Sequence, residues 1–266
     1  MTSSTLRFRP PAGAGFCPRP VPGAALRLFL FHHAGGSHLL YRDWVAHFPA
    51  DWEIHLLDAP GRGRLTDLPA CSDAGQLVDF FHDEIVLAMD RPFAFFGHSM
   101  GGLAAYELTN RLAAEGLPLP VWLGLSARGA PRPPGPSDTR HTLPDDALRH
   151  HLAAMGGTPP EVLQDPEIWQ LFGPMIRTDL RLVETWTPCE GTAPLTVPLS
   201  VFGGSDDVVV SPQRLAAWQQ HARRFLGLHL FDGDHFYFRG RTAEMAALVT
   251  AQIRAATAGA TQGAVR

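Results

Sequence analysis

Ser99 stands between glycines in the run Gly97-His98-Ser99-Met100-Gly101, which has the pattern G-x-S-x-G. An apolar stretch, residues 93–96, precedes this run, and a helical pattern, residues 103–114, follows it. A strand that turns sharply into a helix lifts the serine oxygen above the end of a sheet, and the glycines let strand and helix approach closely. The pattern predicts that Ser99 is a nucleophile.

A serine hydroxyl attacks well only when a base removes its proton, so a histidine and a carboxylate are expected later in the chain. His235 follows the apolar stretch 228–231 and a Gly-Asp turn, which places its imidazole on a loop. The acidic pair Asp206-Asp207 follows another apolar stretch, residues 197–202. The order serine, aspartate, histidine is that of the α/β-hydrolases. We predict Asp207 as the partner of His235, because the next helix would then begin at the usual distance, and Asp206 stays an open alternative.

Attack on a carbonyl also requires N–H donors for the oxygen that becomes negative. One donor is expected to be the backbone N–H of Met100, directly after the nucleophile. The second is expected from an early loop, where the apolar stretch 28–31 opens into His32-His33-Ala34-Gly35-Gly36. Glycines there allow the main chain to approach the substrate, and we predict the N–H of Ala34 as this donor.

The remaining histidines and the cysteines do not predict a metal site. His32, His33 and His98 have no partners at the spacing of zinc ligands, so we expect them to orient loops or to pack. The three cysteines, Cys17, Cys71 and Cys189, are scattered along the chain, which is typical of a protein in a reducing cytosol without a disulfide framework. No metal or cofactor is predicted.

Composition narrows the class of protein further. The chain has 266 residues and a mass of 29.0 kDa, with 45% hydrophobic and 18% charged residues, which suits one globular domain over residues 1–266. A net charge of -4 argues against binding to nucleic acid. Neither a signal peptide nor an apolar run of membrane-spanning length is found. We therefore expect a cytoplasmic protein that binds neither nucleic acid nor membrane, and we expect it to be a monomer.

Strand and helix patterns alternate along the chain. Strands are expected at residues 28–31, 54–57, 93–96, 121–125, 199–202 and 228–231. Helices are expected at residues 41–48, 74–89, 103–114, 212–222 and 242–255. The alternation predicts an α/β fold with a mainly parallel central sheet flanked by helices, and with catalytic loops at the carboxyl ends of the strands. The start through Gly23 is expected to be a surface arm, and the end after Ala256 to be frayed.

About seventy residues separate two of the expected strands where a simple crossover needs far fewer. Helix starts are expected at Pro144-Asp145-Asp146, at Thr158-Pro159-Pro160-Glu161 and at Asp165-Pro166-Glu167. We interpret this insertion, residues 130–190, as a helical lid over Ser99. Met175 and Ile176 lie on its apolar side and are predicted to bind the substrate. The alternative is that the extra helices only enlarge the domain.

These segments together resemble the type II thioesterases that accompany modular polyketide and nonribosomal peptide synthetases. The resemblance covers nearly the whole chain and rests on six segments: His33-Ala34-Gly35-Gly36-Ser37, Ala59-Pro60-Gly61-Arg62, Phe96 to Gly102, Arg177-Thr178-Asp179 with Glu184-Thr185, Gly204-Ser205-Asp206-Asp207, and Gly233-Asp234-His235-Phe236-Tyr237. Val208 follows the aspartates where the family often has proline, and the acidic residue is doubled.

The resemblance implies a stand-alone editing enzyme of the α/β-hydrolase fold with a helical lid. It would hydrolyse acyl groups from the phosphopantetheine arm of acyl or peptidyl carrier proteins through an acyl-enzyme on Ser99, without a cofactor. Arg62 could bind the phosphate of the arm, or it could be a structural arginine that satisfies loop carbonyls. The alternatives are a carboxylesterase or lipase with the same triad and, less favoured because the triad residues are present, a non-catalytic binding module.

Overall fold

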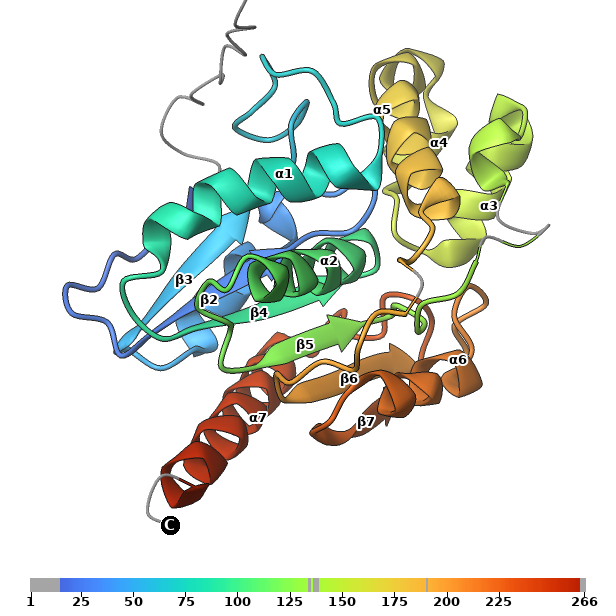
Figure 1. The fold of residues 1–266 in the computed structure, drawn as a ribbon. Helices are drawn as coiled ribbons and strands as arrows, with labels where there is room; N and C mark the ends of the chain where they lie inside the picture. The colour runs from blue at the N-terminus through green and yellow to red at the C-terminus, as the bar shows by residue number, and fades with distance from the viewer. Residues whose placement is uncertain (1–14, 134, 136–138, 190, 264–266) are drawn as a thin grey trace, which may run out of the picture.

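The computed structural model describes residues 15–133, 135, 139–189 and 191–263, and within them seven strands form one sheet (Figure 1). The strands are β1 (Gly15–Phe16), β2 (Leu26–Phe31), β3 (Trp52–Leu57), β4 (Phe93–His98), β5 (Leu123–Ser126), β6 (Leu199–Gly204) and β7 (Phe225–Phe231). Their order across the sheet is β1-β3-β2-β4-β5-β6-β7. Only β1 runs antiparallel to its neighbour among these pairs, so the predicted mainly parallel sheet is confirmed.

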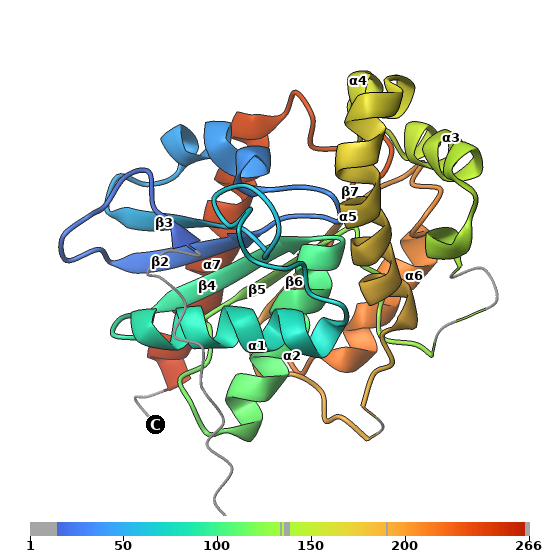
Figure 2. The ribbon, with the colours of Figure 1, turned by 90° about the horizontal axis from the view of Figure 1, so that it is seen from above.

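Helices cover both faces of the sheet (Figures 1 and 2). The α-helices are α1 (Ala74–Ile85), α2 (Met100–Ala114), α3 (Asp145–Met155), α4 (Pro160–Gln164), α5 (Pro166–Thr185), α6 (Pro212–Ala216) and α7 (Thr242–Gly263). The 3₁₀ helices are η1 (His38–His47), η2 (Val86–Ala88), η3 (Arg140–Thr142) and η4 (Ala217–His221). Helices α1 and α2 pack on one face, and η1 and α7 pack on the other. None of the helices in the described residues is both long and apolar enough to cross a membrane.

The apolar strands are explained by this layered arrangement. Every residue of β4 and of β6 is buried, because the side chains on both faces of each strand pack against a layer of helices. Large aromatic side chains fill the two layers: Phe31 and Phe95 pack toward α1 and α2, and Phe96 packs toward η1 and α7. The sheet is therefore held rigidly between two cores, and its carboxyl edge is a fixed platform for loops.

Several expected elements differ from the observed ones at their ends. The stretch expected as a helix at 41–48 is the 3₁₀ helix η1, in which Tyr41 and Trp44 are buried three residues apart. The expected helix at 212–222 is divided into α6 and η4. The expected fraying after Ala256 is wrong, since α7 continues to Gly263. Part of the expected surface arm pairs with β3 as strand β1, and residues 1–14 lie outside the described residues.

Helices η3, α3, α4 and α5, which we call the helical insertion, lie between β5 and β6 beside the carboxyl edge of the sheet (Figure 1). The expected helix starts are found at α3, α4 and α5, and α3 ends at Gly156, whose φ of 79° suits a left-handed cap. The insertion has its own apolar cluster, consisting of Leu148, Leu152, Met155, Trp169, Ile176 and Leu180. It therefore packs as a unit, and Ala34 and Val209 in the loops after β2 and β6 contact its cluster.

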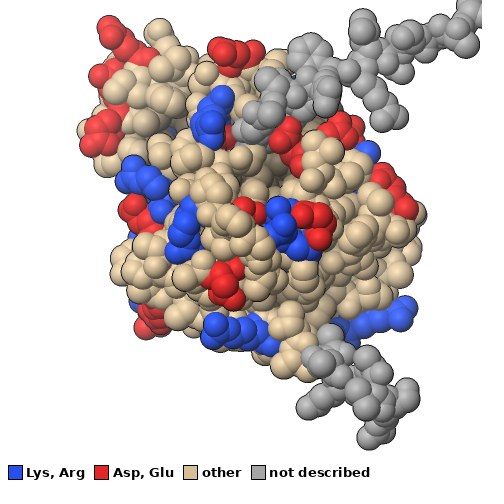
Figure 3. Space-filling view, turned by 90° about the vertical axis from the view of Figure 1, so that its left-hand side faces the viewer, with Lys and Arg blue, Asp and Glu red and all other residues tan. Residues whose placement is uncertain are grey.

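Acidic and basic side chains are interspersed on the face shown in Figure 3, without a large field of one sign. This distribution agrees with the small net charge and does not resemble a surface that binds a phosphate backbone.

Candidate active site

The predicted catalytic residues come together at the carboxyl edge of the sheet. Ser99 directly follows β4, and Ala34 lies in the loop after β2. Asp207 follows β6, and His235 follows β7. Because parallel strands present their carboxyl ends at one edge, four segments far apart in the sequence supply one site.

The backbone at Ser99 has the strained geometry of a nucleophile elbow. Ser99 has a φ of 55° and a ψ of -109°, a conformation that non-glycine residues rarely adopt. Its N–H donates to the carbonyl of Ser126 at 2.8 Å, which ties the elbow to β5. A Cβ at Gly97 would overlap the carbonyl of Gly101, and a Cβ at Gly101 would overlap the carbonyl of Phe31. The two glycines therefore permit the close strand-to-helix approach that presents the serine.

The structure joins Asp207, rather than Asp206, to His235. Oδ2 of Asp207 lies 2.7 Å from Nδ1 of His235, and both side chains are almost fully buried. Oδ1 of Asp207 accepts the backbone N–H groups of Val209 at 2.7 Å and Val210 at 3.1 Å. The carboxylate of Asp206 is exposed and accepts only a hydrogen bond from its neighbour Ser205 among the described residues. Asp207 is thus held in one orientation with its charge facing the imidazole.

The second ring nitrogen of His235 is not hydrogen-bonded to any described residue, Ser99 included. With Nδ1–H donating to Asp207, Nε2 carries the lone pair, and this atom is buried without a hydrogen-bond partner among the described residues. Ser99 and His235 line the same cavity of about 30 Å³. A general base needs an unprotonated nitrogen that can come within hydrogen-bonding reach of the hydroxyl group that it activates.

A chain of buried polar groups supports the elbow from behind. Nδ1 of His98 lies 2.8 Å from the hydroxyl of Ser126, which lies 2.7 Å from the hydroxyl of Tyr237. Burial lowers the pKa of His98 well below its ordinary value and raises the pKa of Tyr237, so both stay neutral. This chain links β4, β5 and the loop that carries His235. It was missed from the sequence, because the three residues are far apart along the chain.

The loop after β2 is held by His32. Nδ1–H of His32 donates to the carbonyl of His33 at 2.7 Å, and Nε2 accepts the N–H of Ala59 at 3.1 Å. Burial, reinforced by the charge of Arg62, lowers the pKa of His32 to about 4, which keeps this neutral tautomer at physiological pH. The prediction that His32 orients a loop therefore agrees with its contacts.

Of the two predicted oxyanion donors, Ala34 lines the 30 Å³ cavity at Ser99, and Met100 directly follows Ser99 in the chain. No hydrogen bond from the N–H of Ala34 to another described residue is found. Met100 is the first residue of α2, where backbone N–H groups lack partners within the helix. The role of these two N–H groups as donors to a carbonyl oxygen at Ser99 stays a prediction.

The 30 Å³ cavity lies between the catalytic residues and the helical insertion. Its other lining residues are His33, Ala34, Arg140, Leu152, Met155, Gly157, Thr158, Ile176, Leu180, Val183 and Phe236. Ile176 thus lies where the sequence predicted. Met175 does not line this cavity in the described structure and packs against the apolar cluster of the insertion. Leu152 and Leu180 were not predicted from the sequence to line this cavity. Their helical spacing from other apolar residues could have indicated that they face the interior.

A second cavity, of about 230 Å³, meets the first at Ser99, Arg140 and Val183. Its lining is rich in cations, with Arg128, Arg132, Arg140 and Arg214, whereas Glu184 is its one acidic lining residue among those described. The carboxylate of Glu184 is already paired with Arg140 and His141. This cavity therefore offers positive charge beside the nucleophile.

Arg62 has the structural role that was one of its two sequence interpretations. Its guanidinium is 5% exposed and binds both carboxylate oxygens of Asp179 on α5, with Nη2 and Oδ1 2.8 Å apart. It also donates to the carbonyl of Pro60. Arg62 is not among the residues lining either cavity at Ser99, so it does not face a phosphate there.

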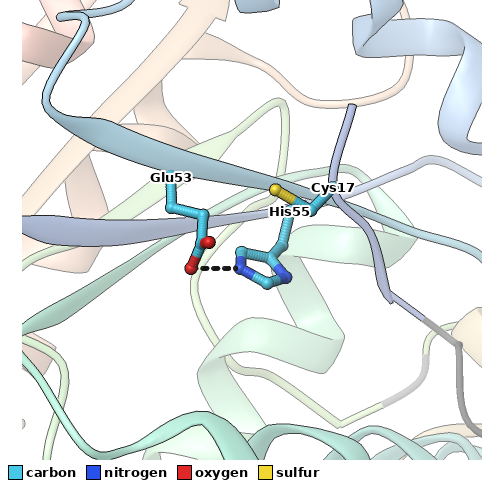
Figure 4. Close-up of side chains that lie close together, drawn as sticks. All are labelled: Cys17, Glu53 and His55. Atoms are coloured by element: carbon cyan, nitrogen blue, oxygen red, sulfur yellow. Dashed lines mark hydrogen bonds and ion pairs between the residues drawn. The ribbon is translucent and has the colours of Figure 1, made fainter. Parts of the chain in front are cut away.

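One group of possible metal ligands lies away from this site. Cys17, Glu53 and His55 are neighbours at the β1–β3 pair, with their ligand atoms within 4.8 Å of one another (Figure 4). The carboxylate of Glu53 is already paired with Arg27 at 2.6 Å and with Nε2 of His55 at 3.2 Å. Burial raises the pKa of the Cys17 thiol, which disfavours the thiolate that a metal needs. The contacts are those of a hydrogen-bonded network around Arg27.

Comparisons with known proteins agree with this geometry. The family described as the thioesterase domain matches residues 26–253. The chain is 33% identical over 232 residues to the gramicidin S biosynthesis protein GrsT of Aneurinibacillus migulanus, an alignment that covers 87% of this chain and 90% of that protein. The solved structure of BorB, a type II thioesterase from the borrelidin cluster, has a TM-score of 0.79 and 30% identity and covers 90% of this chain and 97% of its own.

YbtT, a type II thioesterase from the yersiniabactin pathway, has a TM-score of 0.81 and 28% identity, covering 92% of this chain and 99% of its own. The α/β-hydrolase fold is therefore confirmed. Thioester hydrolysis by a serine nucleophile is the chemistry that the family match implies, and the serine elbow and the Asp207–His235 pair agree with it. The chain belongs to the thioesterase family and is a serine-type hydrolase of thioesters.

Proposed function

We propose that this thioesterase removes acyl groups from the phosphopantetheine arm of acyl or peptidyl carrier proteins, as an editing enzyme of a polyketide or nonribosomal peptide synthetase. The relatives named above come from such pathways, which supports this substrate. The observation that carries the catalytic part is the buried Asp207–His235 pair, which shares one cavity with Ser99.

The contact of Asp207 with His235 supports the following mechanism. Nε2 of His235 takes the proton of Ser99 as the hydroxyl attacks the thioester carbonyl, and Asp207 stabilises the imidazolium that forms. The N–H groups of Ala34 and Met100 bind the negative oxygen of the tetrahedral intermediate. The thiol leaves with the proton from His235, and water activated by the same nitrogen then hydrolyses the acyl-enzyme.

The two cavities at Ser99 differ in the residues that line them, and this difference supports a proposal for the two ends of the substrate. The 30 Å³ cavity has apolar walls from Leu152, Ile176 and Leu180, which suit an acyl chain. This cavity is the smaller of the two at Ser99, which favours short acyl groups. The 230 Å³ cavity has the arginines, which suit the polar arm and its phosphodiester. We propose that the acyl chain occupies the smaller cavity and that the arm lies in the larger one.

A fluorophosphonate probe tests the nucleophile, with the Ser99→Ala variant as control. The wild-type protein should be labelled at Ser99, and the variant should not be labelled. Acetyl release from a carrier protein should fall by roughly 10⁶-fold in the variant, because removing a triad nucleophile disables the whole unit. A variant that kept a tenth of the wild-type turnover would contradict the assignment of Ser99.

A further inference from the structure

Asp179 lies on α5, where the helical insertion meets the loop after β2. Its side chain is 2% exposed. Oδ2 accepts the backbone N–H of Gly35 at 2.7 Å, and Arg62 binds both carboxylate oxygens. These partners are 144 and 117 residues away in sequence. A buried carboxylate with charge-assisted bonds to two segments fixes the positions of both.

The bond to Gly35 acts on the peptide next to the proposed oxyanion donor. The N–H of Gly35 belongs to the peptide that joins Ala34 to Gly35, so Asp179 fixes the plane of that peptide. Gly35 has a φ of 77°, in the left-handed region that glycine adopts readily. Because glycine has no Cβ, its backbone also rotates easily into other conformations unless a contact holds it. A contact from outside the loop is therefore needed to keep this peptide in one orientation.

The peptide on the other side of Ala34 is held as well. The carbonyl of His33 accepts Nδ1–H of His32 at 2.7 Å and the N–H of Gly36 at 3.0 Å. In a trans peptide the N–H points opposite to the carbonyl, so the N–H of Ala34 is directed away from these two donors. The contacts of the His33 carbonyl with His32 and Gly36 therefore set the direction of this N–H, and the contact of Asp179 with Gly35 holds the chain on the other side of Ala34.

A second contact from α5 reaches the same glycine. A Cβ at Gly35 would lie 2.9 Å from Cγ1 of Ile176, one helical turn before Asp179. Ile176 also lines the 30 Å³ cavity at Ser99. The helix that forms a wall of this cavity therefore also holds the loop that carries Ala34.

We propose that Asp179 is a positioning residue of the oxyanion hole: by binding the N–H of Gly35 it holds the peptide that follows Ala34, and packing of α5 against this loop thereby keeps the Ala34 N–H in place at Ser99. The inference rests on the proposed function only through the role of Ala34 as a donor. The two contacts of Asp179 then have different roles. The bond to Gly35 serves catalysis, and the ion pair with Arg62 neutralises the buried charge.

Three variants separate these two contributions: Asp179→Ala, Arg62→Met and the double variant. Arg62→Met leaves Asp179 in place to accept the N–H of Gly35, so stability should fall while kcat stays within about threefold of wild type. The double variant has no unpaired buried charge and should regain part of the stability lost in Asp179→Ala. Its kcat should still be about 10²-fold low with KM nearly unchanged, because a misplaced donor weakens transition-state binding.

The assay uses acetyl-N-acetylcysteamine, a small thioester, so that it reads the oxyanion hole even if the proposed carrier-protein substrate is wrong. Asp179→Asn keeps an oxygen that can accept from Gly35 and should recover most of kcat. In the double variant, an alkylboronic acid that forms a tetrahedral adduct with Ser99 should lose affinity by the same factor as kcat/KM, whereas an acetyl thioether analogue should not. A double variant with the kcat of Arg62→Met, or with its loss confined to KM, would overturn the proposal.

Discussion

Nδ1 of His235 lies 2.7 Å from Oδ2 of Asp207, whereas the adjacent carboxylate of Asp206 is exposed and hydrogen-bonded only to Ser205 among the described residues. Two acidic residues that are neighbours in sequence therefore have different surroundings. The difference arises because Asp207 turns inward and accepts the N–H groups of Val209 and Val210, while Asp206 stays on the outside of the same turn.

Asp207→Asn should lower kcat by about 10⁴-fold, and Asp206→Asn should change it little. An amide in place of Asp207 presents the wrong group to Nδ1 of His235 and favours the wrong tautomer, an effect of this size in serine proteases. Steady-state hydrolysis of acetyl-N-acetylcysteamine by the two variants side by side measures this. The opposite ranking would assign the acid to Asp206.

Leu180→Ala should shift the preferred acyl chain to longer groups, by about three carbon atoms, because it removes a side chain that lines the 30 Å³ cavity. The matched control is Met175→Ala on the same helix, since Met175 does not line this cavity in the described structure. The measurement is kcat/KM over acetyl to octanoyl thioesters. An equal shift in both variants, or none in Leu180→Ala, would contradict the assignment of this cavity to the acyl chain.

A carrier-bound acetyl group should be hydrolysed with higher kcat/KM than the same group on phosphopantetheine, and the latter better than on pantetheine. Remote contacts to protein and phosphate supply binding energy that orients the carbonyl at Ser99. Arg132→Gln should lower kcat/KM for the phosphopantetheine thioester by roughly fivefold, the size of an exposed charge contact, and leave the pantetheine thioester unchanged.

Arg254→Gln serves as the control for this series, because Arg254 is exposed on α7, away from both cavities at Ser99. Equal efficiency on all thioesters, or a preference for the matching oxygen ester, would favour an esterase over the proposed carrier-protein thioesterase.

Stability should fall as the pH decreases from 7 to 5. Burial lowers the pKa values of His32, His33 and His98, so the unfolded chain takes up protons below pH 6.5 that the folded protein does not bind. For His32, with a folded pKa of about 4, the loss would reach about 3 kcal/mol near pH 4. The measurement is the free energy of unfolding in urea at each pH.

Between pH 8 and 7 that free energy should be nearly constant, since these histidines are neutral in both states. His32→Gln should flatten the decrease below pH 6.5, whereas His47→Gln, at an exposed position, should not. A profile that is flat from pH 8 to 5 in the wild-type protein would show that the three imidazoles do not titrate in this way.

The sequence by itself determined the fold and the order of the catalytic segments. Gly97 and Gly101 around Ser99 are a local requirement of the elbow, and the buried strands appear as continuous apolar runs, so both can be identified from neighbouring residues alone. The helix starts of the insertion are likewise local, because caps such as Asp165 act within a few residues. Cytoplasmic location and a monomeric state stay predictions.

Tertiary structure alone decided which side chains face one another across those segments. The choice of Asp207 over Asp206 depends on how one turn packs against the loop of His235, and the pairing of Arg62 with Asp179 joins positions 117 residues apart. Helical periodicity placed Met175 and Ile176 on one apolar side, but only the packing of α5 against Gly35 shows which of the two reaches the cavity. Contacts between distant segments depend on how these segments are placed relative to one another in three dimensions. Local sequence patterns hold no information about that placement.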